Sequence, residues 1–355
     1  MRALVGLKTR ELEELASEMG LEPYRGRQLA HWMYSKRATS FSDMTDLRKD
    51  VREKLLRELE VNPLTVRHVR EHRDGTAKYL FRLTDGECIE GVWLPHRNWE
   101  TVCVSTQVGC PVGCAFCASG RDFVRNLEAG EIIGQVLLAR REESTHVVFM
   151  GIGEPLLNQE AVLRSLEVLN SEVGIGARNV TVSTVGIVDG IVRLADLGKE
   201  VNLGISLHAP DDQLRQGLIE TDLPAVKDIM TAAGYFFRKT GRRISFEYVL
   251  LSDVNDHLNH AAALAGLLTS RDFQFHVNLI QYNETHSPFR RSPATRVREF
   301  AERLREEGIT VTVRKEMGGG IRAACGQLRR RRSGEKRGER ESVTQPRPSR
   351  TSHAP

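Results

Sequence analysis

The chain has 355 residues, of which 40% are hydrophobic and 28% charged. This balance is typical of a globular protein and excludes a collagenous or wholly disordered chain. The formal net charge of +4 is unevenly spread, because residues 329–355 carry nine Lys and Arg against three acids and the rest of the chain is slightly acidic. The length predicts one large domain or two ordinary ones.

The N-terminus carries charged residues too early for a signal peptide, and no run of about 18 apolar residues follows. We therefore expect a cytoplasmic, monomeric protein that does not bind membranes. The basic segment 329–355 is rich in Arg, Ser, Pro and Glu, and it has too few apolar residues to offset the entropy of ordering. We expect this tail to be disordered, either attracting RNA loosely or having no specific role.

Residues 1–75 are expected to form a helical accessory domain. Apolar residues recur there at helical spacing in three stretches, the first of them after Thr9, a residue type that favours helix N-caps. The apolar positions are Leu12, Leu15, Ala16 and Met19, then Leu29, Trp32 and Met33, then Leu47, Val51, Leu55 and Leu56.

Residues 76–100 are expected to form a β-hairpin that links this domain to the next. Two alternating runs, 78–83 and 88–94, flank the dipeptide Asp85-Gly86, which is a strong hairpin signal.

Residues 101–328 show a strand, loop and helix rhythm that repeats about six times. Such βα repeats predict a parallel sheet with right-handed crossovers, here an α/β fold of the incomplete (β/α)6 barrel type. In such a barrel the chemistry lies at the carboxyl ends of the strands. The expected strands are 102–106, 146–150, 180–183, 203–207, 244–250 and 275–280.

The first expected barrel strand is followed by three closely spaced cysteines, Cys110, Cys114 and Cys117. Three thiolates on one loop can hold three irons of a 4Fe–4S cluster and leave the fourth iron open for a substrate. The alternative is a zinc site, although no His or fourth Cys follows at a zinc-finger spacing.

Polar residues also follow the later strands, where ligands of a barrel bind. Taken singly, each is more often an ordinary loop residue. They are Gly153 and Glu154, Ser183, the run Ser206-Leu207-His208, and Asn283.

Several segments together resemble the RlmN/Cfr family of radical S-adenosylmethionine (SAM) RNA methyltransferases over about residues 10–328. The cysteine loop resembles the signature of the wider radical SAM superfamily, and residues 24–28 with 41–47 are similar to the accessory domain of the family. The segments that narrow the resemblance to this family are 102–107, 153–158, 206–210 and 323–328.

The resemblance implies that Cys110, Cys114 and Cys117 bind one 4Fe–4S cluster and that SAM chelates its open iron. Reductive cleavage of SAM then gives a 5′-deoxyadenosyl radical. The family pattern implies SAM contacts from the strand-end residues Gly153, Glu154, Ser183, Ser206, Leu207, His208 and Asn283.

The resemblance also implies three catalytic residues. Cys325 receives a methyl group that is converted to a radical and added to adenine, Cys103 resolves the covalent adduct by forming a disulfide, and Glu90 removes the ring proton. Without the resemblance, Glu90 would be expected to face solvent, Cys103 to be a core residue, and Cys325 to be inert.

The implied substrate is carbon 2 of an adenine in 23S rRNA, with tRNA left open as a second substrate and flavodoxin or ferredoxin as electron donor. Segments 183–187 and 281–283 resemble members that methylate carbon 8, which leaves that alternative open. Two further alternatives are a radical SAM enzyme with a small-molecule or peptide substrate and a non-catalytic RNA-binding protein with zinc. Candidate phosphate contacts are Arg25, Arg27, Lys36, Arg37 and the C-terminal arginines.

Overall fold

The computed structural model describes residues 1–120, 122–142, 144–285, 287–315 and 317–328. The basic segment 329–355, for which disorder is expected, lies outside the described residues. Within the described part, no helix has the length and apolar character needed to cross a membrane.

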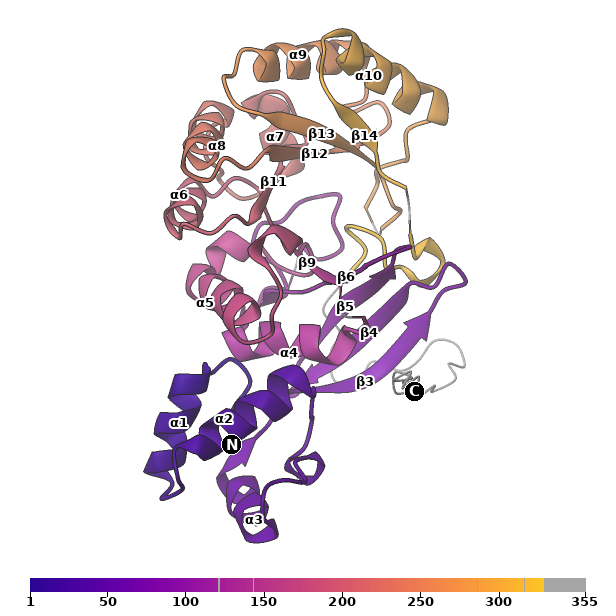
Figure 1. Cartoon of the computed structure of the whole chain (residues 1–355). Helices are drawn as coiled ribbons and strands as arrows, with labels where there is room; N and C mark the ends of the chain where they lie inside the picture. The colour runs from indigo at the N-terminus through magenta and orange to yellow at the C-terminus, as the bar shows by residue number, and fades with distance from the viewer. Residues whose placement is uncertain (121, 143, 286, 316, 329–355) are drawn as a thin grey trace.

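Helices dominate the N-terminal part of the chain, at the bottom of Figure 1. The expected apolar faces are buried, with Leu12 and Leu29 in one core. Thr9 is not an N-cap: it is the first helical residue, and its hydroxyl donates to Glu172 at 2.6 Å. The elements are β1 (Arg2–Ala3), α1 (Thr9–Glu18), α2 (Tyr24–Ala30), the π-helical turn η1 (His31–Ser35), the 3-10 turn η2 (Phe41–Asp43), α3 (Lys49–Glu58) and β2 (Leu59–Glu60).

The helical character expected over the first 75 residues ends earlier, because β3 (Leu64–Glu71) is a strand. It pairs antiparallel with β4 (Ala77–Leu83) and forms one edge of the main sheet. Only Leu64 and Val69 of β3 are buried, so its apolar alternation is weak. An edge strand with one solvated face gives such a weak signal.

The expected hairpin is present as β4 and β5 (Cys88–Pro95), joined by a turn at Gly86. This hairpin belongs to the main sheet, since β5 pairs antiparallel with β6 (Glu100–Cys103) and β6 pairs parallel with β9 (Thr145–Phe149). The antiparallel strands therefore extend the barrel sheet on one side.

The main sheet has ten strands in the order β14-β13-β12-β11-β10-β9-β6-β5-β4-β3 among the described residues. All six expected barrel strands are found, with bounds shifted by at most three residues, and the short β14 adds a seventh parallel strand. The remaining parallel strands are β10 (Val180–Thr184), β11 (Asn202–Ser206), β12 (Ile244–Leu250), β13 (Phe275–Gln281) and β14 (Val311–Val313).

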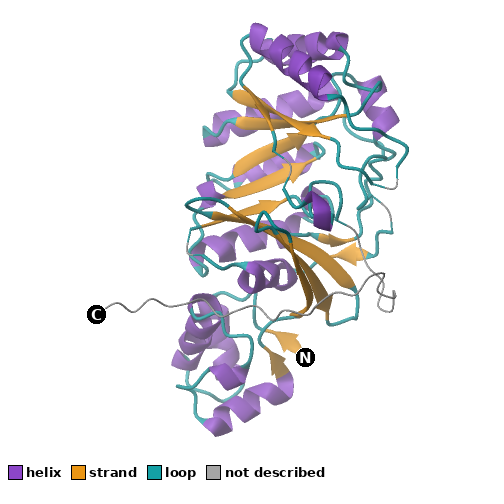
Figure 2. Cartoon of the chain, turned by 90° about the vertical axis from the view of Figure 1, so that its right-hand side faces the viewer, coloured by secondary structure: helices purple, strands orange, loops and turns teal. Residues whose placement is uncertain are grey.

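Helices cover the outer face of the parallel strands and leave the inner face open, as in an incomplete barrel (Figures 1 and 2). The N-terminal helices attach to this layer, because the Lys8 ammonium pairs with Glu167 of α5 at 2.6 Å. The helices are α4 (Ala129–Ala139), α5 (Gln159–Ser171), α6 (Val188–Asp196), α7 (Asp212–Leu218), α8 (Val226–Thr240), α9 (Leu258–Thr269) and α10 (Ala294–Glu306).

Strand register decides which side chains share the inner face. Val92 pairs with Cys103, and Cys103 pairs with Val148, so these three positions lie in one row across β5, β6 and β9. Since side chains alternate along a strand, Glu90 and His146 lie on the same face as this row. The inner face thus continues from the barrel onto the antiparallel strands.

Candidate active site

A cavity of about 160 Å³ lies at the carboxyl ends of the parallel strands, and we call it the upper cavity. It brings together residues that follow six of the strands and residues from the C-terminal segment 317–328. Its lining includes Cys110, Cys114, Cys117, Gly153, Glu154, Ser183, Ser206, His208, Asn283 and Cys325.

The three clustered cysteines lie on the loop after β7 (Gln107–Val108), and all three line the upper cavity. Burial and, to a smaller extent, the neighbouring Cys117 thiol raise the pKa of Cys110 to about 12. Burial followed by the two other thiols also raises the pKa of Cys114. A cationic iron–sulfur cluster would stabilise these thiolates, so the donor set fits such a group.

Gly153 turns the chain into the upper cavity after β9. Its φ is +106°, and a Cβ built there would lie 2.6 Å from Gln107 Cβ, so a larger residue does not fit. Glu154 is buried, and its two carboxylate oxygens accept from the amides of Leu156 at 2.9 Å and Val185 at 2.8 Å. Burial raises the pKa of Glu154 to about 7, despite those hydrogen bonds.

Ser183 and Ser206 end neighbouring strands, and their hydroxyl oxygens lie 3.4 Å apart in the upper cavity. His208 is buried, and its Nδ1 accepts from the Val249 amide at 3.1 Å. Burial lowers the pKa of His208 to about 3, so its imidazole is neutral at pH 7. Leu207 differs from the expectation, because its fully buried side chain packs in the hydrophobic core and is outside the cavity lining.

Asn283 contacts the C-terminal segment. Its Nδ2 donates to the Cys325 carbonyl at 3.1 Å, while its buried Oδ1 has no hydrogen-bond partner among the described residues. The Ala118 amide donates to the Gly326 carbonyl at 2.8 Å. These two contacts hold Cys325 beside the cysteine loop.

Cys103 and Cys325 come close together although 222 positions separate them in the sequence. Burial, followed by the nearby Cys325 thiol, raises the pKa of Cys103 to about 12, whereas Arg314 lowers it. The charge of Cys325 is likewise the main cause that raises the pKa of Arg314. Arg314 lies 3.5 Å from the buried carboxylate of Glu247. One guanidinium thus faces both thiols.

Glu90 is 1% exposed, so the expectation of a solvent-facing side chain from its strand position alone is wrong. Its carboxylate forms an ion pair with Lys78 at 2.8 Å. The Lys78 ammonium also donates to the Arg322 carbonyl at 2.8 Å. Lys78 therefore connects Glu90 to the segment that carries Cys325.

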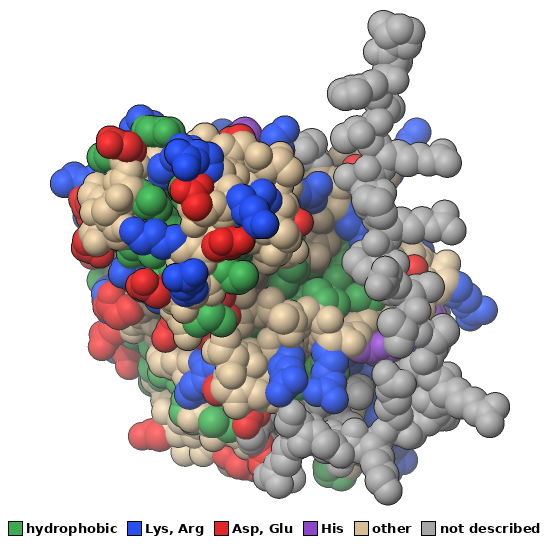
Figure 3. Space-filling model, turned by 90° about the horizontal axis from the view of Figure 1, so that it is seen from below, with side chains coloured by type: hydrophobic (Ala, Val, Ile, Leu, Met, Phe, Trp, Pro, Cys, Tyr) green, Lys and Arg blue, Asp and Glu red, His purple; other side chains and the backbone are tan. Residues whose placement is uncertain are grey.

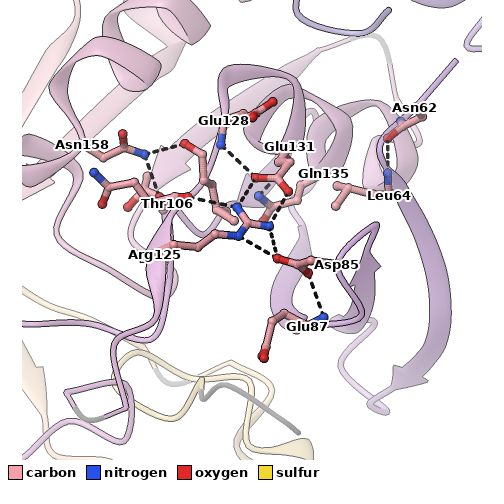
Figure 4. A network of polar contacts seen from close by, with 12 residues as sticks. Asn62, Leu64, Asp85, Glu87, Thr106, Arg125, Glu128, Glu131, Gln135 and Asn158 are labelled. Carbon is pink, nitrogen blue, oxygen red and sulfur yellow. Dashed lines mark hydrogen bonds and ion pairs between the residues drawn. The ribbon is translucent and has the colours of Figure 1, made fainter. Parts of the chain in front are cut away.

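A polar network fixes the chain that leaves the cysteine loop (Figure 4). Arg125 donates two hydrogen bonds to Glu131 of α4, both 2.8 Å long, and one to Asp85 at 2.7 Å. Asn158 donates to the carbonyls of Thr106 and Leu127. The turn of the β4–β5 hairpin and the loop after the cysteines are thereby held together.

Three of the four candidate phosphate contacts of the N-terminal part, Arg25, Arg27 and Arg37, have partners within the protein. Arg27 pairs with Glu13, and Arg37 donates to the Arg140 carbonyl at 2.8 Å. Arg25 lies over the ring of Tyr24, with 4.6 Å between the guanidinium carbon and the ring centroid. Seen from below, the visible part of the described surface mixes basic and acidic side chains (Figure 3).

Three basic residues near the upper cavity escaped the sequence reasoning. Arg314 directly follows β14. Functional residues were expected at the carboxyl ends of the parallel strands, so Arg314 would have been a candidate if this short strand had been predicted. Lys78 reads as one of many charged strand residues, and its partners lie far away in sequence. Arg215 is 2% exposed in α7 and donates to the carbonyls of Leu207 and Val185, and nothing in its local sequence signals this burial.

Comparisons with known proteins agree with this geometry. The family model for the ribosomal RNA large subunit methyltransferase N-terminal domain matches residues 3–61, and the model of the radical SAM superfamily matches residues 104–265. A curated protein of Bacillus subtilis, named probable dual-specificity RNA methyltransferase RlmN, is 43% identical over 330 residues, which cover 90% of each chain.

A second relative with the same name, from Caldicellulosiruptor saccharolyticus, is 42% identical over 90% of this chain and 95% of its own. Among solved structures, a radical SAM methyltransferase from Sphaerobacter thermophilus superposes with a TM-score of 0.89 at 43% identity. That match covers 92% of this chain and 99% of the other.

Proposed function

The chain belongs to the RlmN family of radical SAM RNA methyltransferases, and on this premise we propose that it methylates carbon 2 of an adenine in 23S rRNA, and also in tRNA, through an S-methylated Cys325. As a member of this family the protein is an enzyme that uses SAM and a 4Fe–4S cluster. Beyond family membership, we propose which carbon is methylated, which RNA is the substrate and what each residue does.

The observation that carries the proposal is the convergence of two cysteines outside the cluster loop. Cys325 is close enough to Cys103 to raise its pKa, and Cys325 shares the upper cavity with Cys110, Cys114 and Cys117. A radical SAM enzyme with a small-molecule substrate has no need for this second pair. A structural zinc site would also leave the pair unexplained.

In this proposal Cys110, Cys114 and Cys117 hold the cluster, while Gly153, Glu154, Ser183, Ser206, His208 and Asn283 surround SAM. When bound, the cluster and SAM supply the radical chemistry that removes a hydrogen atom from a methyl group. Glu154 suits the amino group of SAM, because a bound cation would offset the burial that raises its pKa. Leu207 contributes through its backbone, which helps to hold Arg215.

The residues of the chain then divide the work at the adenine. The Cys325 sulfur holds the methyl carbon while that carbon bonds to the ring, and Glu90 accepts the proton from the ring carbon. The Cys103 thiolate attacks the Cys325 sulfur, so that an S–S bond forms while the bond from the Cys325 sulfur to the new carbon breaks. The released carbon keeps the electron pair of that bond and takes up a proton, which leaves a methyl group on the RNA. Arg314 offsets the negative charge at both sulfurs.

The adenine has to leave its stack to reach these groups, which is least costly in an unpaired loop. The proposal of carbon 2 is tested by mass spectrometry of nucleosides from RNA methylated in vitro. Formation of 2-methyladenosine supports it, and formation of 8-methyladenosine contradicts the proposed carbon while leaving the residue roles intact.

The residue roles are tested with three variants of the reconstituted enzyme, in each of which one cysteine is replaced by alanine. Cys325→Ala should give no methylated RNA while keeping the absorption of the cluster. Cys103→Ala should accumulate a covalent protein–RNA adduct, visible as a shifted band on a denaturing gel, because the resolving thiol is missing.

The matched control is Cys88→Ala, which replaces a buried cysteine of β5 that lies outside the upper cavity. It should methylate RNA at the wild-type rate and give no adduct. Methylation by Cys325→Ala, or its loss in Cys88→Ala with the fold intact, would refute the assigned roles.

A further inference from the structure

A second cavity lies on the inner face of the barrel, nearer the amino ends of the strands, and we call it the lower cavity. Its volume is about 660 Å³. Its lining is mostly polar and includes the basic side chains of Arg242, Arg243 and Arg314. The one carboxylate in the lining, Glu247, already faces Arg314 at 3.5 Å. The lower cavity is therefore suited to an anionic, polar ligand.

Some polar atoms around the lower cavity lack a partner. His276 Nδ1 and Arg242 Nε are buried without a hydrogen bond among the described residues. A buried donor or acceptor that forms no hydrogen bond destabilises the protein, and a bound ligand can supply the missing hydrogen bond.

The lower cavity adjoins the upper cavity, with which it shares Met150, Glu247 and Arg314. The C-terminal segment, which carries Cys325, contacts the antiparallel strands. That segment attaches to the β3–β4 turn through the Gly318 amide, which donates to Asp74 at 2.9 Å. A ligand that extends from the reacting thiols therefore finds room along the lower cavity.

An aromatic stack that includes His146 of β9 adjoins the same face. The rings of His96 and Trp99 stack with 4.9 Å between centroids, and Trp99 lies 5.8 Å from the ring of His146. Trp99 is 42% exposed, so part of this residue is accessible from solvent. Burial lowers the pKa of both histidines, which keeps their rings neutral at pH 7.

Strand register relates this stack to the reaction site and to the lower cavity. His146 and Val148 lie on the same face of β9, and Val148 lines the lower cavity. Trp99 precedes Cys103 by four residues, which corresponds to about 13 Å along an extended strand. This separation suits contact with a nucleotide near the target in sequence.

We propose that the stack of His96, Trp99 and His146 binds an unpaired base that flanks the target adenine, and that the lower cavity holds the adjoining RNA backbone. This inference rests on the proposed function, because it takes RNA as the substrate. Aromatic rings together with arginines are the combination that binds single-stranded RNA, by base stacking and phosphate contact. A protein partner would not require the cationic lower cavity.

The test measures binding of a fluorescein-labelled RNA hairpin, with an unpaired adenine between unpaired pyrimidines in its loop, to the full-length protein by fluorescence anisotropy. Trp99→Ala should raise Kd about 5- to 100-fold, the usual cost of losing one stacked base. Trp99→Phe keeps an aromatic ring and should stay within about threefold of wild type. RNA should quench part of the tryptophan emission in wild type, and this part should be absent in Trp99→Ala.

The phosphate contact is tested separately with Arg243→Gln. The logarithm of the binding constant falls linearly with the logarithm of the salt concentration. In this variant the fall should be less steep by about 0.7, as expected for one lost phosphate contact to a single strand. The matched aromatic control is Tyr235→Ala on α8, in the outer helical layer, which should bind like wild type.

The outcomes separate the inference from the proposed function. Wild-type methylation of this RNA together with unchanged binding and kcat/KM in Trp99→Ala would overturn the stacking site alone. An equal loss of binding in Tyr235→Ala would also overturn it, because the effect would then be unspecific. If wild type neither binds nor methylates RNA, the proposed function fails and the inference fails with it.

Discussion

Replacing Lys78 by methionine tests the buried ion pair beneath the segment that carries Cys325. The Lys78 and Glu90 side chains are 8% and 1% exposed, and their charged atoms lie 2.8 Å apart. Removing one partner of a buried pair typically lowers the free energy of unfolding by about 3–5 kcal/mol, since the remaining charge stays in a poorly solvated place. Lys78→Met also removes the hydrogen bond to the Arg322 carbonyl, so methylation should fall as well.

The assay is urea denaturation followed by tryptophan fluorescence, with the slope m used to check that the same surface unfolds. The double variant Lys78→Met/Glu90→Gln should be more stable than Lys78→Met alone, because the unpaired charge is gone. Such a coupling is what a double-mutant cycle measures. The matched control is Lys239→Met, at a side chain that is 52% exposed and pairs with Asp196 at 3.7 Å, and its midpoint should not change.

A loss below about 1 kcal/mol in Lys78→Met would refute the reasoning, since a buried pair costs more than that to break. A double variant no more stable than Lys78→Met would refute it as well. Either result would mean that Glu90 finds solvent or another cation once Lys78 is gone.

Two further predictions concern charge in the upper cavity. The pKa of Glu154 is raised from 4.5 to about 7, so between these values the folded protein holds a proton that the unfolded chain releases. The contribution of Glu154 to the free energy of unfolding should therefore fall by about 3 kcal/mol as pH rises from 4.5 to 7, measured as the difference between wild type and Glu154→Gln. Equal pH profiles of the two proteins would contradict this. Arg314→Gln should raise the pKa of Cys103 further and lengthen the lifetime of the protein–RNA adduct about tenfold, whereas Arg314→Lys should shorten it again. An unchanged lifetime in Arg314→Gln would show that this charge does not act on the resolving thiol.

The barrel could be predicted because its parallel strands are buried and apolar. Strand β12 has the bounds that the sequence predicts, since the run from Ile244 to Leu250 is almost wholly buried. Strand β3 was missed because its edge position leaves polar side chains on the solvated face. Its strand conformation is set by the partner β4, which local sequence does not report.

The candidate SAM residues were predicted from their positions at the carboxyl ends of the parallel strands, and most of them line the upper cavity. The side chain of Leu207 does not. Side chains alternate along an extended chain, so Ser206 and His208 face the cavity while Leu207 between them faces the core. The period of two was available from the sequence and would have excluded the Leu207 side chain. The charged state of Glu154 and His208 could not be read in the same way, because it depends on burial by other segments.

The groups proposed to act on adenine come from parts of the chain that only the tertiary structure joins. Glu90 lies on an antiparallel strand beyond the parallel barrel, and Lys78 on the next strand reaches Arg322 across 244 positions of sequence. The C-terminal segment completes the site only because it crosses from β14 to the β3–β4 turn and back to the cysteine loop. The lower cavity, which shares residues with the upper cavity, is where we propose that the RNA backbone lies. The antiparallel strands thus supply both a proposed catalytic group and one wall of the proposed path for the substrate.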